Sequence, residues 1–444
     1  MAGSHRPLLA VFETAITALA LVGLFVVQVQ FIGAATGFPA LRSVPEASAL
    51  ALPAAQDGPI EAEYCSEAVA AHDPDNPAGR TSTRLELEDA WFDGSSQRYH
   101  HGIATGCAVL SAVCNSESHF YGGGNDGVPY AERALGSLGF THVRTDSYAL
   151  RSAVLDQMAA LVNGSHDVAA YTFASKRIAA GGTTRSEAGA EADTLVFVGI
   201  RGSYGAEWLS NFNLPDAESS GADHRGFKTA EQEVEASLER YLAEIGADPA
   251  RTRIVVTGHS RGGAIANLLA ADLIDRASGP DALAPVDRIF AYTFAAPCST
   301  QANDRNGEAY AGIFNVVNPS DLVPQLPLPA WGYGRYGTTV ELPGLDDARF
   351  ASSLALMQQA YQANTGTLSA YDAESLARLD SFDAQAAQSL PTLESLLNPA
   401  GLASAVQALL GVDLGLAMTS HYPDTYIAWM QTLDGSALTF VRSG

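Results

Sequence analysis

The stretch that decides the fold reads Ile254-Val255-Val256-Thr257-Gly258-His259-Ser260-Arg261-Gly262-Gly263, followed by Ala264-Ile265-Ala266-Asn267-Leu268-Leu269. Its first four residues form an apolar, β-branched run typical of a strand buried on both faces. The last six predict a helix. Gly258 and Gly262 flank Ser260 in a G-x-S-x-G turn, where small residues relieve the crowding around a strained serine. We expect Ser260 to project at the strand's carboxyl end, beside the positive end of the helix.

A serine in such a turn acts as a nucleophile only with a base and an acid that orients the base. In folds that carry this turn, the acid and then the histidine follow the serine in the sequence. His421 is the only histidine downstream of Ser260, so it is the predicted base.

The acid is chosen from about a dozen aspartates by its place on a strand. Asp321 follows the strand-like run 313–317, and active-site residues of open parallel sheets lie at the carboxyl ends of strands. We therefore predict Asp321 as the acid. The other aspartates considered are interpreted as solvated charges on polar helical faces: Asp346, Asp347, Asp372, Asp380 and Asp383.

An acyl-transfer site also needs backbone N–H groups that stabilise the oxyanion. Arg261, directly after the serine, is predicted to supply one of them. Ser203 follows the strand-like run 194–200 and is predicted to supply the other.

Strand-like runs alternate with helical segments through the second half of the chain, which predicts a mostly parallel central sheet with helices on both faces. A helical N-terminal region and a helical insert before His421 are expected in addition. The expected strands are residues 168–173, 194–200, 253–257, 288–295, 312–317 and 338–342, and the expected helices include residues 101–113, 131–138, 149–162 and 424–430.

The composition is that of a compact globular enzyme rather than a disordered chain. Hydrophobic residues make up 47% of the 444 residues, and 49 acidic against 25 basic side chains give a net charge of −24. This charge repels phosphate backbones and excludes nucleic-acid binding. No HExxH, P-loop or paired-cysteine motif occurs, so neither a metal nor another cofactor is expected. His100, His101 and His119 are interpreted as scattered surface histidines.

The N-terminus has the pattern of an export element. No charged residue lies between Glu13 and Arg42, and the apolar run 14–27 is typical of a signal peptide. The uncharged stretch is also long enough for an uncleaved anchor, so residues 1–35 are a signal peptide or a membrane anchor, and residues 36–60 a linker. Either alternative places the protein outside the cytoplasm, secreted or anchored. Cys65 with Cys107 or Cys114 is the expected disulfide, and no disulfide at all is the equal alternative.

In four blocks the sequence resembles the class 3 (fungal-type) triacylglycerol lipases. The blocks are Arg201-Gly202-Ser203 with Trp208 and Asn211, then His224 to Phe227, Thr257 to Gly263, and Tyr292 to Phe294 through Asn318, Asp321, Val323 and Pro324. The resemblance covers roughly residues 190–330 and a short piece around His421, and the family says nothing about residues 36–190. It implies an α/β-hydrolase fold, and we expect this domain to extend over residues 61–444 with its core motifs at 190–330. It also implies a triad of Ser260, Asp321 and His421, oxyanion contacts from Ser203 and Arg261, and a lid or pocket rim around Trp208.

Two departures from that family bear on the substrate. The position after the serine is commonly leucine in the family, and Arg261 makes this pocket more polar. The interval between Asp321 and His421 is long, and residues 345–415 carry apolar residues at helical spacing. This insert is interpreted either as ordinary core or as a cap over the pocket.

Together these features predict an exported serine hydrolase that cleaves carboxylic esters, acylglycerols foremost. A short-chain esterase or an acyltransferase would use the same residues. An interaction protein on a hydrolase scaffold, anchored in the envelope, is the non-enzymatic alternative. The expected partner is a lipid or small ester substrate, and the sequence does not predict an oligomeric state.

Overall fold

The computed structural model describes residues 52–56, 58–123, 127–146, 148, 169–179, 192–202, 222–371, 376 and 414–442. The predicted export segment 1–35 and the expected helix 149–162 lie outside these residues. Among the residues that are described, no helix is long and apolar enough to cross a membrane.

The centre of the molecule is an eight-stranded sheet with the order β10-β9-β8-β7-β6-β5-β4-β3. Strands β5 to β9 pair in parallel, whereas β3, β4 and β10 pair antiparallel at the two edges. The mostly parallel sheet is therefore confirmed. Its strands are β3 (Thr141–Asp146), β4 (Tyr171–Ala179), β5 (Ala192–Ile200), β6 (Thr252–His259), β7 (Ile289–Phe294), β8 (Ile313–Val317), β9 (Thr338–Glu341) and β10 (Thr439–Val441).

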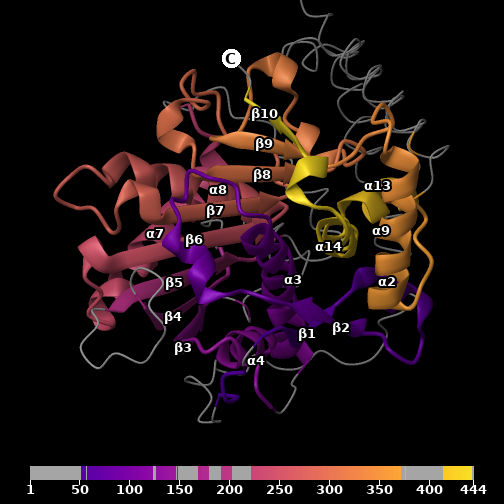
Figure 1. The fold of residues 1–444 in the computed structure, drawn as a ribbon, viewed down its shortest axis with the longest axis horizontal. Coiled ribbons are helices and arrows are strands. Elements are labelled where there is room, and N and C mark those ends of the chain that lie inside the picture. The colour runs from indigo at the N-terminus through magenta and orange to yellow at the C-terminus, as the bar shows by residue number, and fades with distance from the viewer. Residues whose placement is uncertain are drawn as a thin grey trace, which may run out of the picture.

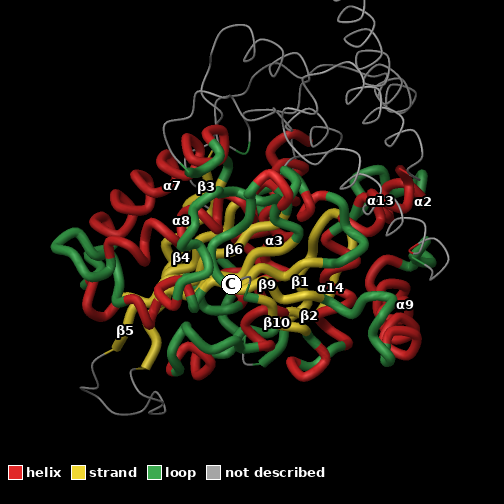
Figure 2. The backbone as a smooth tube through the Cα atoms, turned by 90° about the horizontal axis from the view of Figure 1, so that it is seen from above, coloured by secondary structure: helices red, strands yellow, loops and turns green. Residues whose placement is uncertain are grey.

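Helices cover both faces of this sheet, as the alternation of strands and helices predicted (Figures 1 and 2). Helices α7 (Arg225–Glu244) and α8 (Arg261–Arg276) pack together on one face. Helix α3 (His101–Gly123) lies on the other, with α14 (Pro423–Thr432) between it and α9 (Phe350–Thr365).

The two hydrophobic cores follow from the alternation of side chains along the strands. In β5, Phe197 faces the core beneath α3, whereas Val196 and Val198 face the core beneath α7 and α8. In β6, Val255 faces the core beneath α3, whereas Ile254 and Val256 face the core beneath α7 and α8. Because both faces are covered, these strands are apolar at almost every position.

The N-terminal region contains strands as well as the expected helices. Strands β1 (Ile60–Cys65) and β2 (Arg80–Leu85) form a separate antiparallel sheet that packs on α3, with α2 (Glu67–His72) between them in the sequence and α4 (Tyr130–Ser137) packed against β1. The expectation of a purely helical region is therefore incomplete. The alternation Ile60-Glu61-Ala62-Glu63-Tyr64 is typical of a strand with one buried face.

Strand β4 differs in its bounds from the run expected at 168–173, because it continues through Lys176 to Ala179. Lys176 is buried, yet it has partners: its Nζ lies 2.5 Å from Asp89 Oδ1 and 4.5 Å from the centre of the Phe140 ring. The ion pair allows a charged residue within a buried strand, which hydrophobic patterning does not reveal.

In the described part of the 345–415 insert, one face of α9 belongs to the core. Leu354, Met357 and Tyr361 of α9 are buried against α14, whereas Leu356, expected in the same apolar stripe, is 50% exposed. Most of residues 372–413 lie outside the described part of the chain, so a capping role for them stays a prediction. Asp346 and Asp347 lie in the turn before α9 rather than on a helix, where Asp346 is exposed as expected of a solvated charge.

Helix α13 (Leu414–His421) leads directly into α14, and 3₁₀ helices connect several of the strands.

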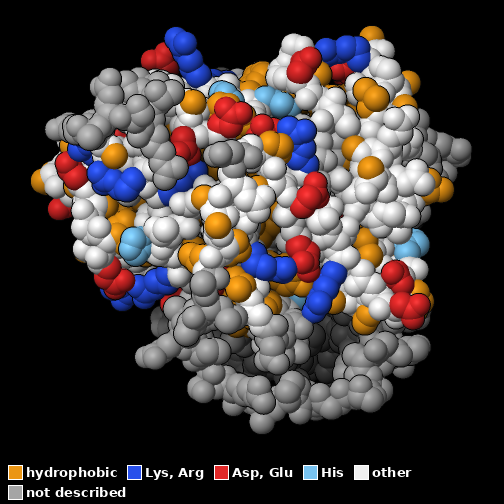
Figure 3. Space-filling model, turned by 60° about the horizontal axis from the view of Figure 1, so that its bottom comes forward, with side chains coloured by type: hydrophobic (Ala, Val, Ile, Leu, Met, Phe, Trp, Pro, Cys, Tyr) orange, Lys and Arg blue, Asp and Glu red, His pale blue; other side chains and the backbone are white. Residues whose placement is uncertain are grey.

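All four cysteines are free, so the alternative without a disulfide holds in this structure. On the face shown in Figure 3, acidic and basic side chains lie interspersed with hydrophobic ones. The 3₁₀ helices are Asp89–Asp93, Pro249–Arg251, Val286–Arg288, Glu308–Tyr310, Val323–Gln325, Pro329–Trp331 and Gly435–Ala437.

Candidate active site

Ser260 lies at the sharp turn between β6 and α8, as the G-x-S-x-G pattern predicts. Its backbone has φ 57° and ψ −130°, a strained conformation for a residue with a side chain, which costs of order 1–3 kcal/mol. The two glycines are sterically required: a Cβ on Gly258 would collide with the carbonyl of Gly262, and one on Gly262 with that of Ile200. The turn therefore lifts the serine hydroxyl clear of the sheet edge.

The structure brings Ser260, His421 and Asp321 together from three separate parts of the chain. His421 Nε2 lies 2.9 Å from Ser260 Oγ, and His421 Nδ1 lies 2.8 Å from Asp321 Oδ2. All three residues are buried, and Asp321 follows β8 at the carboxyl edge of the sheet. This geometry allows the imidazole to accept the serine proton while the carboxylate holds its other nitrogen.

The Asp321 carboxylate has further hydrogen-bond donors that the sequence did not indicate. Tyr426 OH donates to Oδ2 at 2.7 Å, and the N–H of Val323 donates to Oδ1 at 3.0 Å. Tyr426 OH in turn accepts from the N–H of Asn318, and the Asn318 side chain donates to the carbonyl of Ser420. These bonds fix the acid loop and the residue before the histidine relative to each other.

His259, within the turn itself, holds the backbone of His421. Its Nε2 donates to the His421 carbonyl at 2.8 Å, and the two ring centres lie 4.9 Å apart. Burial lowers the pKa of His259 well below its usual value, and the nearby His421 lowers it further. The ring therefore stays neutral at pH 7 and acts as a hydrogen-bond donor rather than a charge.

The predicted oxyanion residues are described only in part. Arg261 is the first residue of α8, and its N–H is one of the four that a helix cannot pair internally. Ser203 and Trp208 lie outside the described residues, so their roles stay predictions. Gly202, just before Ser203, is described and lies against the turn: a Cβ there would lie 2.6 Å from the His259 carbonyl oxygen.

A buried carboxyl group connects the N-terminal region to the helix that follows His421. Asp424, in the first turn of α14, accepts hydrogen bonds from Tyr64 OH at 2.7 Å and from Ser66 Oγ at 2.9 Å. Burial raises its pKa from 3.8 to about 6, although both hydroxyl donors lower it. This contact holds α14, and with it the His421 backbone, against β1.

We expect the Asp424→Asn variant to lose part of the pH dependence of stability. The folded state binds this proton more tightly than the unfolded state, so Asp424 makes the wild type less stable as pH rises from about 4 to about 6. The shift corresponds to at most about 3 kcal/mol. Urea unfolding at pH 4 and pH 7 of the wild type and the variant measures it. The same wild-type-to-variant difference at both pH values would contradict the assignment, and the exposed Asp346→Asn is the control.

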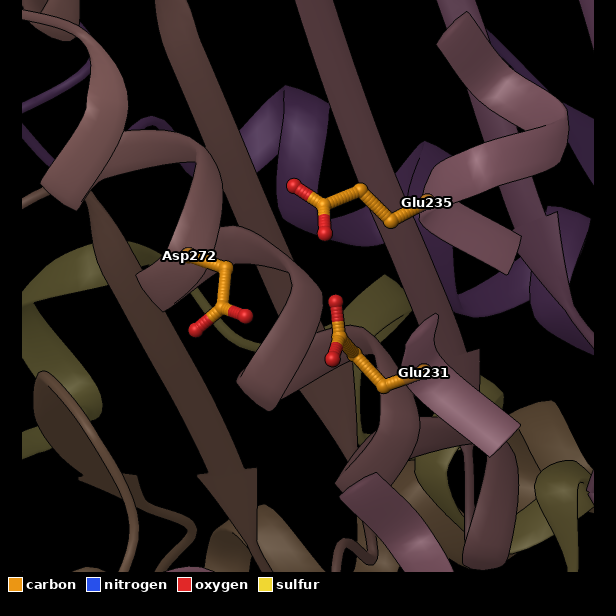
Figure 4. Close-up of side chains that lie close together, drawn as sticks. All are labelled: Glu231, Glu235 and Asp272. Carbon is orange, nitrogen blue, oxygen red and sulfur yellow. The ribbon is translucent and has the colours of Figure 1, made fainter. Parts of the chain in front are cut away.

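The described residues contain one group of acidic side chains close enough to hold a metal ion. Glu231 and Glu235 of α7 and Asp272 of α8 turn their carboxylates toward one another (Figure 4). Two basic residues already pair with this cluster: Lys228 Nζ bonds Asp272 and lies 3.1 Å from Glu231 Oε2, and Arg276 Nη1 lies 2.7 Å from Glu235 Oε1. We therefore interpret the cluster as an ion-pair network. Among the described residues, His100, His101 and His119 do not belong to any group with such spacing.

The strand, the sharp turn and the following helix, set in a mostly parallel sheet with helices on both faces, define an α/β-hydrolase fold. Residues 197–331 match the family model described as lipase (class 3). This part of the chain is therefore similar to the class 3 lipases.

The chain is also similar to two fungal lipases over part of its length. The chain is 31% identical over 149 residues to the secreted mono- and diacylglycerol lipase 1 of Fusarium solani. The aligned residues make up 31% of this chain and 41% of that protein. It is 28% identical over 150 residues to a lipase of Rhizomucor miehei, covering 32% and 40%. The chain thus spans about two fifths of the length of these relatives. Among solved structures, it is similar to a lipase from Rhizopus microsporus var. chinensis at a TM-score of 0.34 and 16% identity, covering 58% of this chain and 76% of that one.

Proposed function

We propose that this protein is a serine hydrolase that cleaves carboxylic esters, acylglycerols foremost, through a triad of Ser260, His421 and Asp321. The observation that carries the proposal is the pair of contacts made by His421, 2.9 Å to the serine hydroxyl and 2.8 Å to the Asp321 carboxylate. The similarity of residues 197–331 to class 3 lipases and the activity of the Fusarium solani mono- and diacylglycerol lipase support the choice of acylglycerol esters.

The reaction follows from the roles that these groups can take. His421 accepts the proton of Ser260 as the serine oxygen attacks the ester carbonyl, and the N–H groups of Ser203 and Arg261 stabilise the oxyanion. His421 then gives the proton to the leaving alcohol, which leaves an acyl-enzyme. A water molecule, deprotonated by His421, releases the carboxylic acid and restores Ser260. Asp321 holds the imidazole and stabilises its charged form throughout.

The proposal extends to the surroundings of the triad. The segment around Trp208 forms a lid or pocket rim, and part of the insert 345–415, within residues 372–413, caps the pocket. No metal or organic cofactor takes part. Residues 1–35 export the chain, as a cleaved signal or a membrane anchor, and the secreted relative supports export.

A series of nitrophenyl esters from acetate to palmitate, together with a triacylglycerol emulsion, tests the substrate class. A lipase cleaves the emulsion and the long-chain esters at rates comparable to or above the acetate. Cleavage limited to acetate and butyrate would instead indicate a short-chain esterase. Transfer of the acyl group to an added alcohol in preference to water would indicate an acyltransferase, and no turnover of any ester would favour the interaction-protein alternative.

A further inference from the structure

The loop that leads out of β5 is held at the candidate active site by helix α3. The N–H of Gly202 donates to Asn115 Oδ1 at 2.8 Å, and Arg201 Nη1 donates to Ser118 Oγ at 2.6 Å. Asn115 and Ser118 are three residues apart on α3 and therefore lie on the same face of the helix. Two consecutive residues of the loop are thus tied to one helical turn.

Helix α3 can do this because it packs against the end of β5. A Cβ on Gly199 would collide with the Sγ of Cys114, so only glycine permits this approach. On its other side the loop lies against the nucleophile turn, since a Cβ on Gly202 would lie 3.4 Å from Ser260 Cβ and 3.5 Å from Asn115 Oδ1. Gly202 is therefore enclosed between the Asn115 side chain and Ser260.

The backbone donors of this loop are already committed as far as Gly202. The N–H of Arg201 donates to the carbonyl of Ala170 at 2.9 Å, and that of Gly202 is taken by Asn115. Neither can stabilise an oxyanion. The next N–H along the chain belongs to Ser203, whose nitrogen is bonded directly to the carbonyl carbon of Gly202. Fixing the Gly202 peptide thus limits where that N–H can lie.

We propose that Asn115 is a positioning residue for the oxyanion hole, acting through Gly202; this rests on the proposed hydrolase function. Its amide oxygen holds the Gly202 peptide beside the nucleophile turn and keeps the following N–H aimed at the developing oxyanion. Asn115 does not touch the reacting atoms. Its effect falls on the transition state, where the oxyanion forms, rather than on binding of the ester in its ground state.

The test compares Asn115→Ala and Asn115→Leu with the wild type, with turnover expressed per active site titrated by a fluorophosphonate. Leucine has the same branching and the same number of side-chain heavy atoms as asparagine, but it accepts no hydrogen bond. Removal of one oxyanion donor costs about 10²- to 10³-fold in kcat, and we expect loss of its support to cost about 10- to 100-fold, with KM changed less than about 3-fold. The affinity for a trifluoromethyl ketone, which forms a tetrahedral oxyanion on Ser260, falls in proportion to kcat/KM.

The pH midpoint of kcat/KM stays unchanged in both variants, because the triad is untouched. The matched control is Ser111→Ala, a buried serine on the same helix whose hydroxyl bonds only the Ala108 carbonyl among the described residues. Unchanged kcat per active site, a loss confined to KM, or a shifted pH midpoint would each overturn the proposal. If Ser260→Ala keeps its turnover, the proposed function itself fails. If Ser260→Ala is inactive and both Asn115 variants are normal, only the role of Asn115 fails.

Discussion

Substitution of Ser260 by alanine is expected to lower kcat for ester hydrolysis about 10⁶-fold, since the members of a triad act as a unit and loss of the nucleophile removes nearly all of its contribution. The fold should persist, because alanine removes one hydroxyl at a turn whose shape depends on Gly258 and Gly262. Steady-state kinetics with a nitrophenyl ester, alongside thermal unfolding, measures both effects.

The control for this variant is Ser237→Ala, a buried serine of α7 on the sheet face away from α3 and α14. It should hydrolyse esters at the wild-type rate. Turnover of Ser260→Ala within about tenfold of the wild type would show that another group carries the reaction, because a triad without its nucleophile retains only the small residual contribution of binding and the oxyanion hole.

Substitution of Asp321 by asparagine is expected to lower kcat about 10⁴-fold while KM changes little. The carboxylate accepts the Nδ1–H of His421, which leaves Nε2 without a proton and able to accept one from Ser260. An asparagine that turns its amide toward Nδ1 donates instead. The imidazole then carries its proton on Nε2 and cannot act as the base.

The kinetics of Asp321→Asn should be compared with those of Asp347→Asn, which removes an exposed ion pair with Arg349. The Asp347 variant should be indistinguishable from the wild type, because a surface ion pair contributes little. Near-normal turnover in Asp321→Asn would mean that a different carboxylate orients His421 and that the strand-end argument for the acid is wrong.

The parts of the fold that the sequence predicts are those with local hydrophobic patterns. Strands β5 to β8 are mostly apolar because they are covered on both faces, and the bounds of β5 to β9 agree with expectation to within two residues. The turn at Ser260 follows from its two glycines. The order of serine, acid and histidine, with a single histidine downstream, led to three residues that the structure places within hydrogen-bonding distance.

What could not be predicted depends on contacts between distant segments. Tyr426 resembles any apolar residue of an amphipathic helix, and nothing local shows that its hydroxyl reaches Asp321. The extension of β4 through Lys176 depends on Asp89, which lies far away in the sequence. Asn115 is one polar residue in a mainly apolar helix, and only the close approach of α3 to Gly199 gives it a partner. By contrast, the alternation of apolar and polar residues in β1 is visible in the sequence and is typical of a strand with one buried face.

The central claim, that Ser260 is the nucleophile of a hydrolase, is tested most directly by mapping a fluorophosphonate adduct. The folded protein is treated with the probe, its intact mass is measured, and the modified peptide is sequenced by mass spectrometry. We predict one adduct per chain, on Ser260, with loss of ester hydrolysis in the same proportion as the labelling. An adduct on another serine that abolishes turnover, or full turnover after complete labelling of Ser260, would contradict the claim.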